Sequence, residues 1–212
     1  MIITRIERQK KNKGRFSIFV DGQYYGSLVD EVFAASGFQE GREFDEGIFL
    51  KLKNRDEARV AFDQALRFLE KRARSEHEVR EKLKSRDFSD EAVESAVEKL
   101  KGYRYIDDSQ FAGMLLSDEI NIKLGSRRSA MMRLKKSGVG EEAALAALEG
   151  YSDEDERENA LMWAKKLTNR YQSEDDGNKK KQKIAAAMAR RGFGWETIRK
   201  AIEEAAGGNI EE

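Results

Sequence analysis

The spacing of apolar residues changes along this chain, and the change falls near residue 55. Before residue 30, β-branched and aromatic residues cluster in short segments, which is typical of strands. These segments are 2–6, 16–20 and 24–28. Lys13-Gly14 and Asp21-Gly22 separate them, and Asp-Gly is a strong hairpin signal. We therefore predict a three-stranded antiparallel meander at the N-terminus.

The remaining apolar residues have helical spacing. Short helices are predicted over Val29–Ala35, with Gly37 as a left-handed cap, and over Asp45–Leu52. From Asp56 onward, apolar residues three and four positions apart share one face, which predicts a longer helix that stops near Arg74.

One apolar pattern occurs three times. Four residues recur at a constant offset of 51 positions and then at a constant offset of 54. The three sets are Leu83, Phe88, Ala96 and Val97; Leu134, Val139, Ala147 and Leu148; and Met188, Phe193, Ala201 and Ile202. A constant offset indicates one supersecondary unit used repeatedly, which we call a module. Such repeats stack in a row and expose a long surface suited to another macromolecule.

Turn signals divide each module into a lead helix, a second helix, a tight turn and a third helix. Gly138 and Gly192 follow the second helix, where a positive φ is expected, and Asp87 takes this place in the first module. Ser75 and Glu78 form a capping box at the start of a second helix. The third helices are predicted to begin at caps formed by Ser89, Gly140 and Gly194.

Lead helices of the later modules are predicted over Ser109–Lys123 and Asp153–Tyr171, with a polar loop over 172–178. The predicted fold is mainly α: three tandem three-helix modules after a small β-rich and helical extension. The predicted boundaries are 1–55 for the extension, 56–107, 108–151 and 152–206 for the modules, and 207–212 for a C-terminal tail.

The composition excludes several kinds of site and several classes of protein. The 212 residues include no proline, which fits a chain of helices, and no cysteine, which excludes disulfides and thiolate metal sites. No apolar run approaches the roughly 20 residues of a membrane span, and the N-terminus has no apolar signal core. We therefore expect a cytoplasmic protein. We also expect a monomer, as a separate prediction.

Charge distribution is more informative than net charge, because Lys+Arg and Asp+Glu both number 40. No acidic residue lies between Ile120 and Gly140 or between Gly177 and Trp195, and both windows contain a predicted second helix. Repeated basic helices would present a positive stripe to nucleic-acid phosphates or to an acidic protein surface. Within these windows the candidate contact residues are Lys123, Arg127, Arg128, Arg133, Lys135, Lys136, Lys179, Lys180, Lys181, Lys183, Arg190 and Arg191.

Catalytic and cofactor signals are missing from the sequence. The phosphate-binding pattern GxxxxGK[ST] does not occur, and His77 is the only histidine and is expected at the surface. Asp107-Asp108 could hold magnesium in a nuclease, but a helix cap explains this pair more simply, and Asp175-Asp176 is expected in a solvated loop. Trp163 and Trp195 are expected in the core rather than as platforms for base stacking. We predict no enzyme, metal or cofactor.

Several of these segments resemble the RecX family, bacterial regulators of the recombinase RecA. The matching residues lie between 60 and 205, and none is found in the first 55. They are Arg72-Ala73-Arg74-Ser75 with Glu78 and Leu83; Ile106-Asp107-Asp108 with Phe111-Ala112; Gly125, Arg128 and Leu134 with Gly138-Val139; and Arg190-Arg191-Gly192-Phe193 with Ile198.

The resemblance implies an elongated, curved array of three modules that binds RecA and its nucleoprotein filament, in the filament groove. It also implies that the protein dampens ATP hydrolysis, strand exchange and coprotease function, and that it can bind DNA directly. Arg72 and Arg74 become weaker candidate contacts. A stand-alone DNA-binding module that uses the basic second helices is the alternative.

Overall fold

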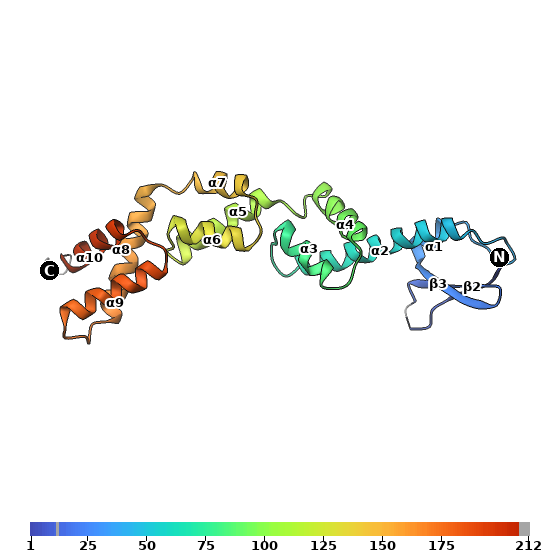
Figure 1. Cartoon of the computed structure of the whole chain (residues 1–212), viewed down its shortest axis with the longest axis horizontal. Coiled ribbons are helices and arrows are strands. Elements are labelled where there is room, and N and C mark those ends of the chain that lie inside the picture. Colours follow the sequence, from blue (N-terminus) through green and yellow to red (C-terminus); the bar gives the residue numbers. More distant parts are fainter. Residues whose placement is uncertain (12, 208–212) are drawn as a thin grey trace. The chain divides into compact units, whose positions relative to one another are not determined.

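The computed structural model describes residues 1–11 and 13–207. The chain forms two compact units (Figure 1). The first contains residues 1–73 and 79–106, and the second contains residues 74–78 and the chain from residue 107 onward. Helix α3 therefore contributes its first turn to the second unit and the rest of its length to the first.

The N-terminal strands form the predicted antiparallel meander. β1 (Ile3–Arg8), β2 (Arg15–Val20) and β3 (Gln23–Val29) pair in the order β1-β2-β3. Asp21 and Gly22, which join β2 to β3, have φ values of 48° and 83°. Two consecutive residues with positive φ are what a type I′ hairpin turn requires, so the Asp-Gly signal is confirmed.

The sheet buries one face against two helices. Ile3, Ile18 and Leu28 are completely buried and pack with aromatic residues such as Phe44 and Phe49. The covering helices are α1 (Asp30–Ala34), close to its predicted position, and the first turns of α2.

Helix α2 (Glu46–Leu69) corrects two boundaries. The sequence predicted two helices, one over Asp45–Leu52 and one from Asp56 to about Arg74, but one continuous helix begins after the Asp45 cap and ends at Leu69. Polar residues around position 55 interrupt the apolar pattern without breaking the helix, because they include neither glycine nor proline. Residues 70–74 instead form the connection to α3.

Asp56 explains why this polar stretch remains helical. Its side chain is buried, forms an ion pair with Arg15 at 2.6 Å, and accepts a hydrogen bond from the backbone N–H of Val29 at 2.6 Å. A buried carboxylate with two such partners ties the middle of α2 to strands β2 and β3.

The rest of the first unit packs around α3 (Glu76–Lys84) and α4 (Asp90–Gly102). Val79 and Leu83 of α3 are buried with the apolar face of α4 and with Ala61 and Phe62 of α2. The Ser75–Glu78 capping box is present: the Ser75 hydroxyl accepts from the Glu78 amide at 3.1 Å, and Glu78 accepts from the Ser75 amide at 3.4 Å.

In the second unit, the first helical cluster contains α5 (Asp108–Ser117), η1 (Asp118–Ile122), α6 (Arg127–Lys136) and α7 (Glu141–Leu148). The sequence predicted one α-helix up to Lys123, but the helix widens to a π-helical turn from residue 118. This turn places the Glu119 carboxylate in the interior, where Arg133 and Ser129 contact it.

The second helical cluster contains α8 (Asp153–Arg170), α9 (Gly177–Arg190) and α10 (Trp195–Gly207). Asp176 was expected in a solvated loop, but its carboxylate caps α9 by accepting from the amides of Asn178 and Lys179 at 2.9 and 3.1 Å. Trp195 was expected in the core, but 70% of its surface is exposed.

Left-handed turns follow all three second helices, as predicted. The φ values of Asp87, Gly138 and Gly192 are 61°, 72° and 83°. The next helices begin directly after Ser89, Gly140 and Gly194, also as predicted.

Candidate basic binding surface

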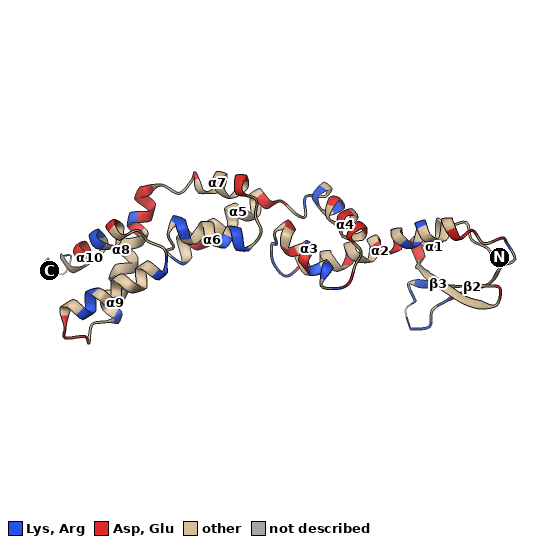
Figure 2. Cartoon of the chain, in the orientation of Figure 1, with Lys and Arg blue, Asp and Glu red and all other residues tan. Residues whose placement is uncertain are grey.

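The two acid-free windows form helices α6 and α9 of the second unit. Ser126 caps α6 by accepting from the Ser129 amide at 3.1 Å, and Asp176 caps α9. Figure 2 shows Lys and Arg on both helices and Asp and Glu gathered at the start of α8. The two basic helices therefore belong to one unit, and their side chains can be compared directly.

Five basic residues from the two helices line one hollow of about 440 Å³. They are Arg128, Arg133 and Lys136 from α6 and Arg190 and Arg191 from the C-terminal end of α9. Its other lining residues are neutral, including Met132, which is 62% exposed. We call these five residues the basic hollow. No acidic residue of the described chain lines the hollow, so its unpaired positive charges produce a field that attracts phosphates or carboxylates.

Two residues of the basic hollow are held by neighbouring groups. Arg133 forms a hydrogen-bonded ion pair with the buried Glu119 and lies 3.5 Å from Asp118. The hydrogen bond to Glu119 raises the pKa of Arg133 above its usual value. Arg191 donates to the Lys123 carbonyl, and its guanidinium lies 3.7 Å from the centre of the Trp163 ring. These contacts fix both guanidinium groups before any partner binds.

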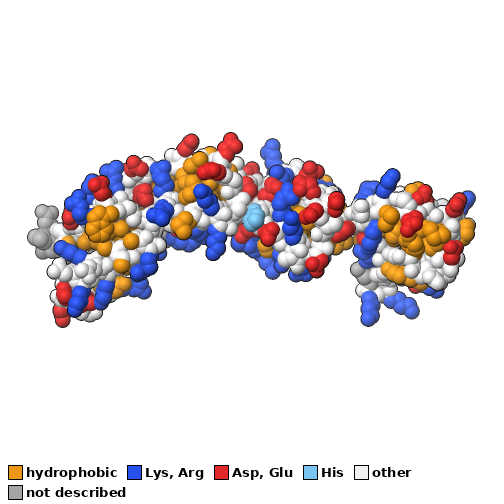
Figure 3. Space-filling view, in the orientation of Figure 1, with side chains coloured by type: hydrophobic (Ala, Val, Ile, Leu, Met, Phe, Trp, Pro, Cys, Tyr) orange, Lys and Arg blue, Asp and Glu red, His pale blue; other side chains and the backbone are white. Residues whose placement is uncertain are grey.

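The other three, Arg128, Lys136 and Arg190, are exposed. They form no hydrogen bond or ion pair with any residue in the described part of the chain. Because no described residue of the unit pairs with them, they are the cations of the hollow best suited to contact an external anion. Figure 3 shows Lys and Arg side chains on the surface of the part of the chain that contains α6 and α9.

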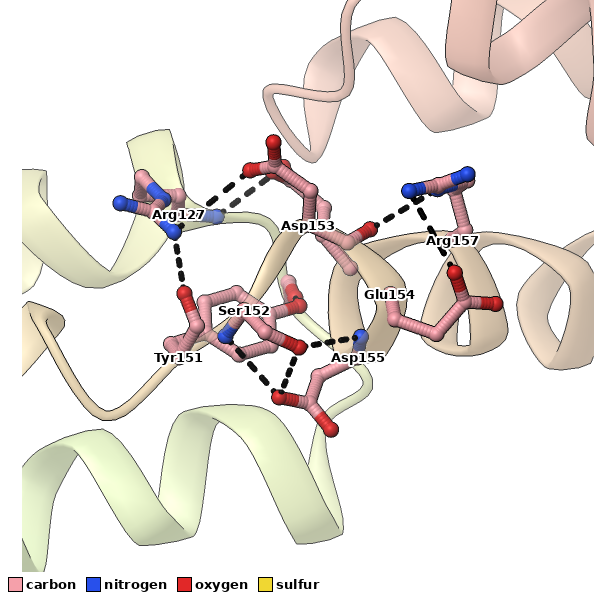
Figure 4. A network of polar contacts seen from close by, with 9 residues as sticks. Arg127, Tyr151, Ser152, Asp153, Glu154, Asp155 and Arg157 are labelled. Carbon is pink, nitrogen blue, oxygen red and sulfur yellow. Dashed lines mark hydrogen bonds and ion pairs between the residues drawn. The ribbon is translucent and has the colours of Figure 1, made fainter.

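Arg127 was a candidate contact, but it binds within the unit (Figure 4). Its guanidinium donates to the Tyr151 carbonyl and lies 3.6 Å from Asp153, and its backbone N–H donates to Glu156 at 3.1 Å. The acidic run at the start of α8 suits the positive end of the helix dipole, and its Asp153 and Glu156 also bind Arg127. Ser152 and Asp155 form a capping box beside it.

The lysines at the N-terminal end of α9 lie apart from the hollow. At 1.5 Å per residue, Lys180 lies about 15 Å along the helix from Arg190. Lys183 pairs with Glu174, which raises the pKa of that lysine, and Lys179 lies 3.8 Å from Asp176. Lys180 and Lys181 make no such contact with the described residues.

The remaining candidates do not line the hollow either. Lys123 pairs with Asp118 at 3.1 Å and with Glu119, and Lys135 is exposed. Arg74 lies 3.8 Å from Glu78. Arg72 belongs to the first unit and donates to the carbonyl of Ala73 at 2.9 Å.

Sequence reasoning missed one basic segment. The loop from β1 to β2 contains Lys10, Lys11 and Lys13, all exposed, and no acidic residue lies between Glu7 and Asp21. The acid-free criterion that selected the two helical windows would have found this third one. This segment lies between two strands, outside the repeated helices, so the repeat does not point to it.

Among residues 1–11 and 13–207, no group of three or more His, Asp or Glu side chains could hold a metal ion. No helix in this part of the chain combines the length and the apolar character of a membrane span. Asp107 caps α5 by accepting from the Gln110 amide at 3.0 Å, as predicted.

These features define a class: a protein of three-helix domains with a basic surface and a small N-terminal sheet. Family models identify the particular family. RecX, first three-helix domain, matches residues 61–100; RecX, third three-helix domain, matches 153–202; and the Regulatory protein RecX N-terminal domain matches 1–45. The chain belongs to the RecX family. The third match corrects our expectation that the first 55 residues carry no family motif.

Relatives and solved structures agree with this assignment. The chain is 32% identical to "Regulatory protein RecX" of Listeria welshimeri, over 97% of this chain and 76% of that protein. It is 30% identical to the protein of the same name from Clostridium botulinum, over 96% and 95%. A crystal structure of regulatory protein RecX matches with a TM-score of 0.72 and 29% identity, over 96% of this chain and 98% of that one. RecX from Lactobacillus salivarius matches with a TM-score of 0.62 and 28% identity, over 71% and 97%.

Proposed function

We propose that this protein binds the RecA recombinase and its nucleoprotein filament and mainly inhibits ATP hydrolysis, strand exchange and coprotease activity. We also propose that it acts without catalysis. Family membership supports the partner, and the basic hollow supports the mode of contact. Three unpaired cations beside two prearranged arginines offer a polyanionic filament a ready contact, because little side-chain order must be gained on binding.

The three modules, 56–107, 108–151 and 152–206, would contact successive parts of the filament groove. A filament repeats the same surface many times, so each module can meet an equivalent site. Linked weak contacts then combine into tight binding through effective concentration. Cytoplasmic location and a monomeric state belong to the same proposal.

The test is the DNA-dependent ATPase of RecA measured with increasing concentrations of this protein. The wild-type chain should inhibit. The triple variant Arg128→Ala, Lys136→Ala, Arg190→Ala should need about tenfold or more protein for the same inhibition, because each truncated contact weakens a charged interface. These side chains hold no other residue in place, so the variant should keep its fold.

A matched control is Lys165→Ala, Lys166→Ala. Both lysines are exposed on α8 of the same unit and line no part of the basic hollow. This variant should inhibit like the wild type. Absence of inhibition by the wild-type protein at saturating concentration would refute the proposed function, and equal loss in the two variants would remove the hollow from it.

Direct DNA binding is the second candidate, favoured by the absence of acidic residues from the described lining of the hollow. Binding of bare single-stranded DNA should then weaken with salt, with a log–log slope near −0.7 for each neutralised phosphate. Parallel titrations of bare DNA and assembled filament separate the two candidates. Much tighter filament binding supports the first.

A further inference from the structure

A second hollow in the second unit is different in character from the basic hollow. It has a volume of about 220 Å³ and lies between α9 and α10, with a floor of Ala185, Ile198 and Ile202. Trp195 lines it and is 70% exposed. The lining is mostly apolar, so this hollow would not hold a hydrated ion.

The exposure of Trp195 contrasts with the packing of the other tryptophan, Trp163. Trp163, on α8 of the same helical cluster, packs against the buried residues and is covered by the guanidinium of Arg191. Trp195 begins α10 one turn before Ile198, which is 2% exposed. The chain thus buries the apolar residue of this turn and leaves the larger aromatic ring at the mouth of the hollow.

Cations border the exposed ring. Lys181 lines the hollow and forms no ion pair with the described residues, and Gln182 beside it offers an amide. Arg199 also lines it and lies 3.6 Å from Glu203, the one acidic residue among the described residues of the lining, and the Arg199 side chain is 53% exposed. Lys180 directly precedes Lys181 on α9 and forms no ion pair with the described residues, so it adds to the positive charge.

We propose that Trp195 is a stacking platform for a base of single-stranded nucleic acid, with Lys181 placed to contact a neighbouring phosphate. An aromatic face beside lysines is the combination that proteins use for single strands without sequence preference. The site lies outside the basic hollow, and the proposal does not depend on the regulation of RecA.

Charge and size favour a nucleic acid over a peptide. Residues 177–195 contain no acidic side chain, so the segment that leads to Trp195 attracts phosphates. The hollow is smaller than the roughly 300–1,000 Å³ of sites that enclose a whole organic ligand, which suits one flat ring laid on its open side.

Tryptophan fluorescence tests the proposal, because the chain has only two tryptophans. In Trp163→Phe, only Trp195 emits, and an oligothymidylate should quench it. In Trp195→Phe, only Trp163 emits, and the same titration should leave the signal nearly unchanged. Circular dichroism of both variants checks that they are folded.

Affinity for the oligonucleotide gives a second measurement. Trp195→Ala should weaken binding about 5- to 150-fold, the range for the loss of one base–aromatic stack. Trp195→Tyr should restore most of the affinity, because it keeps an aromatic face. Lys181→Ala should weaken binding and reduce its salt dependence. Met114→Ala, which removes an exposed apolar side chain from α5, is the matched control and should have no effect.

Inorganic polyphosphate separates stacking from simple charge attraction. It should compete for the protein but should not quench Trp195, since it has no base. Equal quenching by polyphosphate, or oligonucleotide affinity unchanged in Trp195→Ala, would overturn the proposal. An effect of Trp195→Ala that is confined to binding of RecA or of an acidic peptide would assign the hollow to a protein partner and would also overturn it.

Discussion

Two serines that lie 51 residues apart make the same contacts, and comparing them separates what the repeat requires from what each copy adds. The Ser75 hydroxyl donates to the carbonyl of Ser137, just before Gly138. The Ser126 hydroxyl donates to the carbonyl of Arg191, just before Gly192, at 2.8 Å. Both serines also cap a helix and are completely buried. We call these contacts the first and second serine joints.

The backbone beside each serine repeats a second contact. The N–H of Glu76 donates to Asp108 at 2.7 Å, and the N–H of Arg127 donates to Glu156 at 3.1 Å. In both joints, a carboxylate from the following lead helix meets the positive end of a second helix. The repeat therefore conserves a way of joining helices, not only an apolar pattern.

The second joint has an additional polar network. The Tyr151 hydroxyl donates to the Gly125 carbonyl at 2.8 Å, and the Asn159 amide donates to the Ile120 carbonyl at 3.1 Å and to the Tyr151 hydroxyl. Tyr103, 48 residues before Tyr151, is 59% exposed. These additional hydrogen bonds hold the segment from η1 to α6 in place. That segment contains groups that bind the two held arginines of the basic hollow.

Removing either serine hydroxyl should have the largest effect. Ser126→Ala loses a helix cap and leaves a buried carbonyl unpaired, so unfolding free energy should fall by about 2–4 kcal/mol, and Ser75→Ala should cost a similar amount. Urea unfolding followed by circular dichroism measures both. Ser85→Ala, at an exposed serine, is the control and should change stability by less than about 0.5 kcal/mol. If the two substitutions lower the free energy of unfolding by different amounts, the two serine joints are not equivalent.

Gly138→Ala should cost about 1–3 kcal/mol, because an alanine at φ 72° is strained and its Cβ would overlap His77. The double variant Gly138→Ala, His77→Ala separates the two causes, because removing the imidazole relieves much of the overlap and leaves mainly the backbone strain. In Gly192→Ala, the new Cβ would lie 2.8 Å from the Ser126 hydroxyl and should weaken the second joint itself. If Gly138→Ala costs the same with and without His77, close packing plays no part at the first joint.

Tyr151→Phe tests the network that only the second joint has, and should cost about 0.5–1.5 kcal/mol at neutral pH. Burial raises the pKa of Tyr151 to about 12 from its ordinary value of 10.0. The folded state therefore holds the proton more tightly than the unfolded chain does. The stability that the protonated Tyr151 hydroxyl contributes is therefore fully present below pH 10, and it is lost as the pH rises toward 12. Unfolding measured across this range should be less pH-dependent in Tyr151→Phe than in the wild type.

Asp87→Gly should have the smallest effect and the opposite sign. Asp87 adopts φ 61° at the position where the other two copies have glycine. Glycine should raise the free energy of unfolding by up to about 1 kcal/mol, because the left-handed conformation disfavours residues with a Cβ. Thermal unfolding in parallel with Asp87→Ala checks this, and a stabilising alanine would argue against backbone strain.

The sequence by itself determined the class of fold, the repeat and most helix boundaries. Apolar spacing, glycine after each second helix, and the Ser75–Glu78 capping box depend on neighbours close in the chain, so local rules were sufficient. The same holds for the Asp21-Gly22 hairpin. The acid-free windows were also visible, because they are a property of composition.

Only the tertiary structure decided which charges are available. Arg127, Arg133 and Arg191 are arginines in the acid-free windows, yet their partners come from residues 14 to 68 positions away. Trp195 was assigned to the core because helical spacing places it on the face of Ile198, but packing against α9 covers the isoleucine and leaves the ring exposed. Asp56 is the opposite case, because it is a charged residue that the fold buries and pairs with Arg15. Pairing and burial depend on contacts between distant segments, and a linear pattern does not contain them.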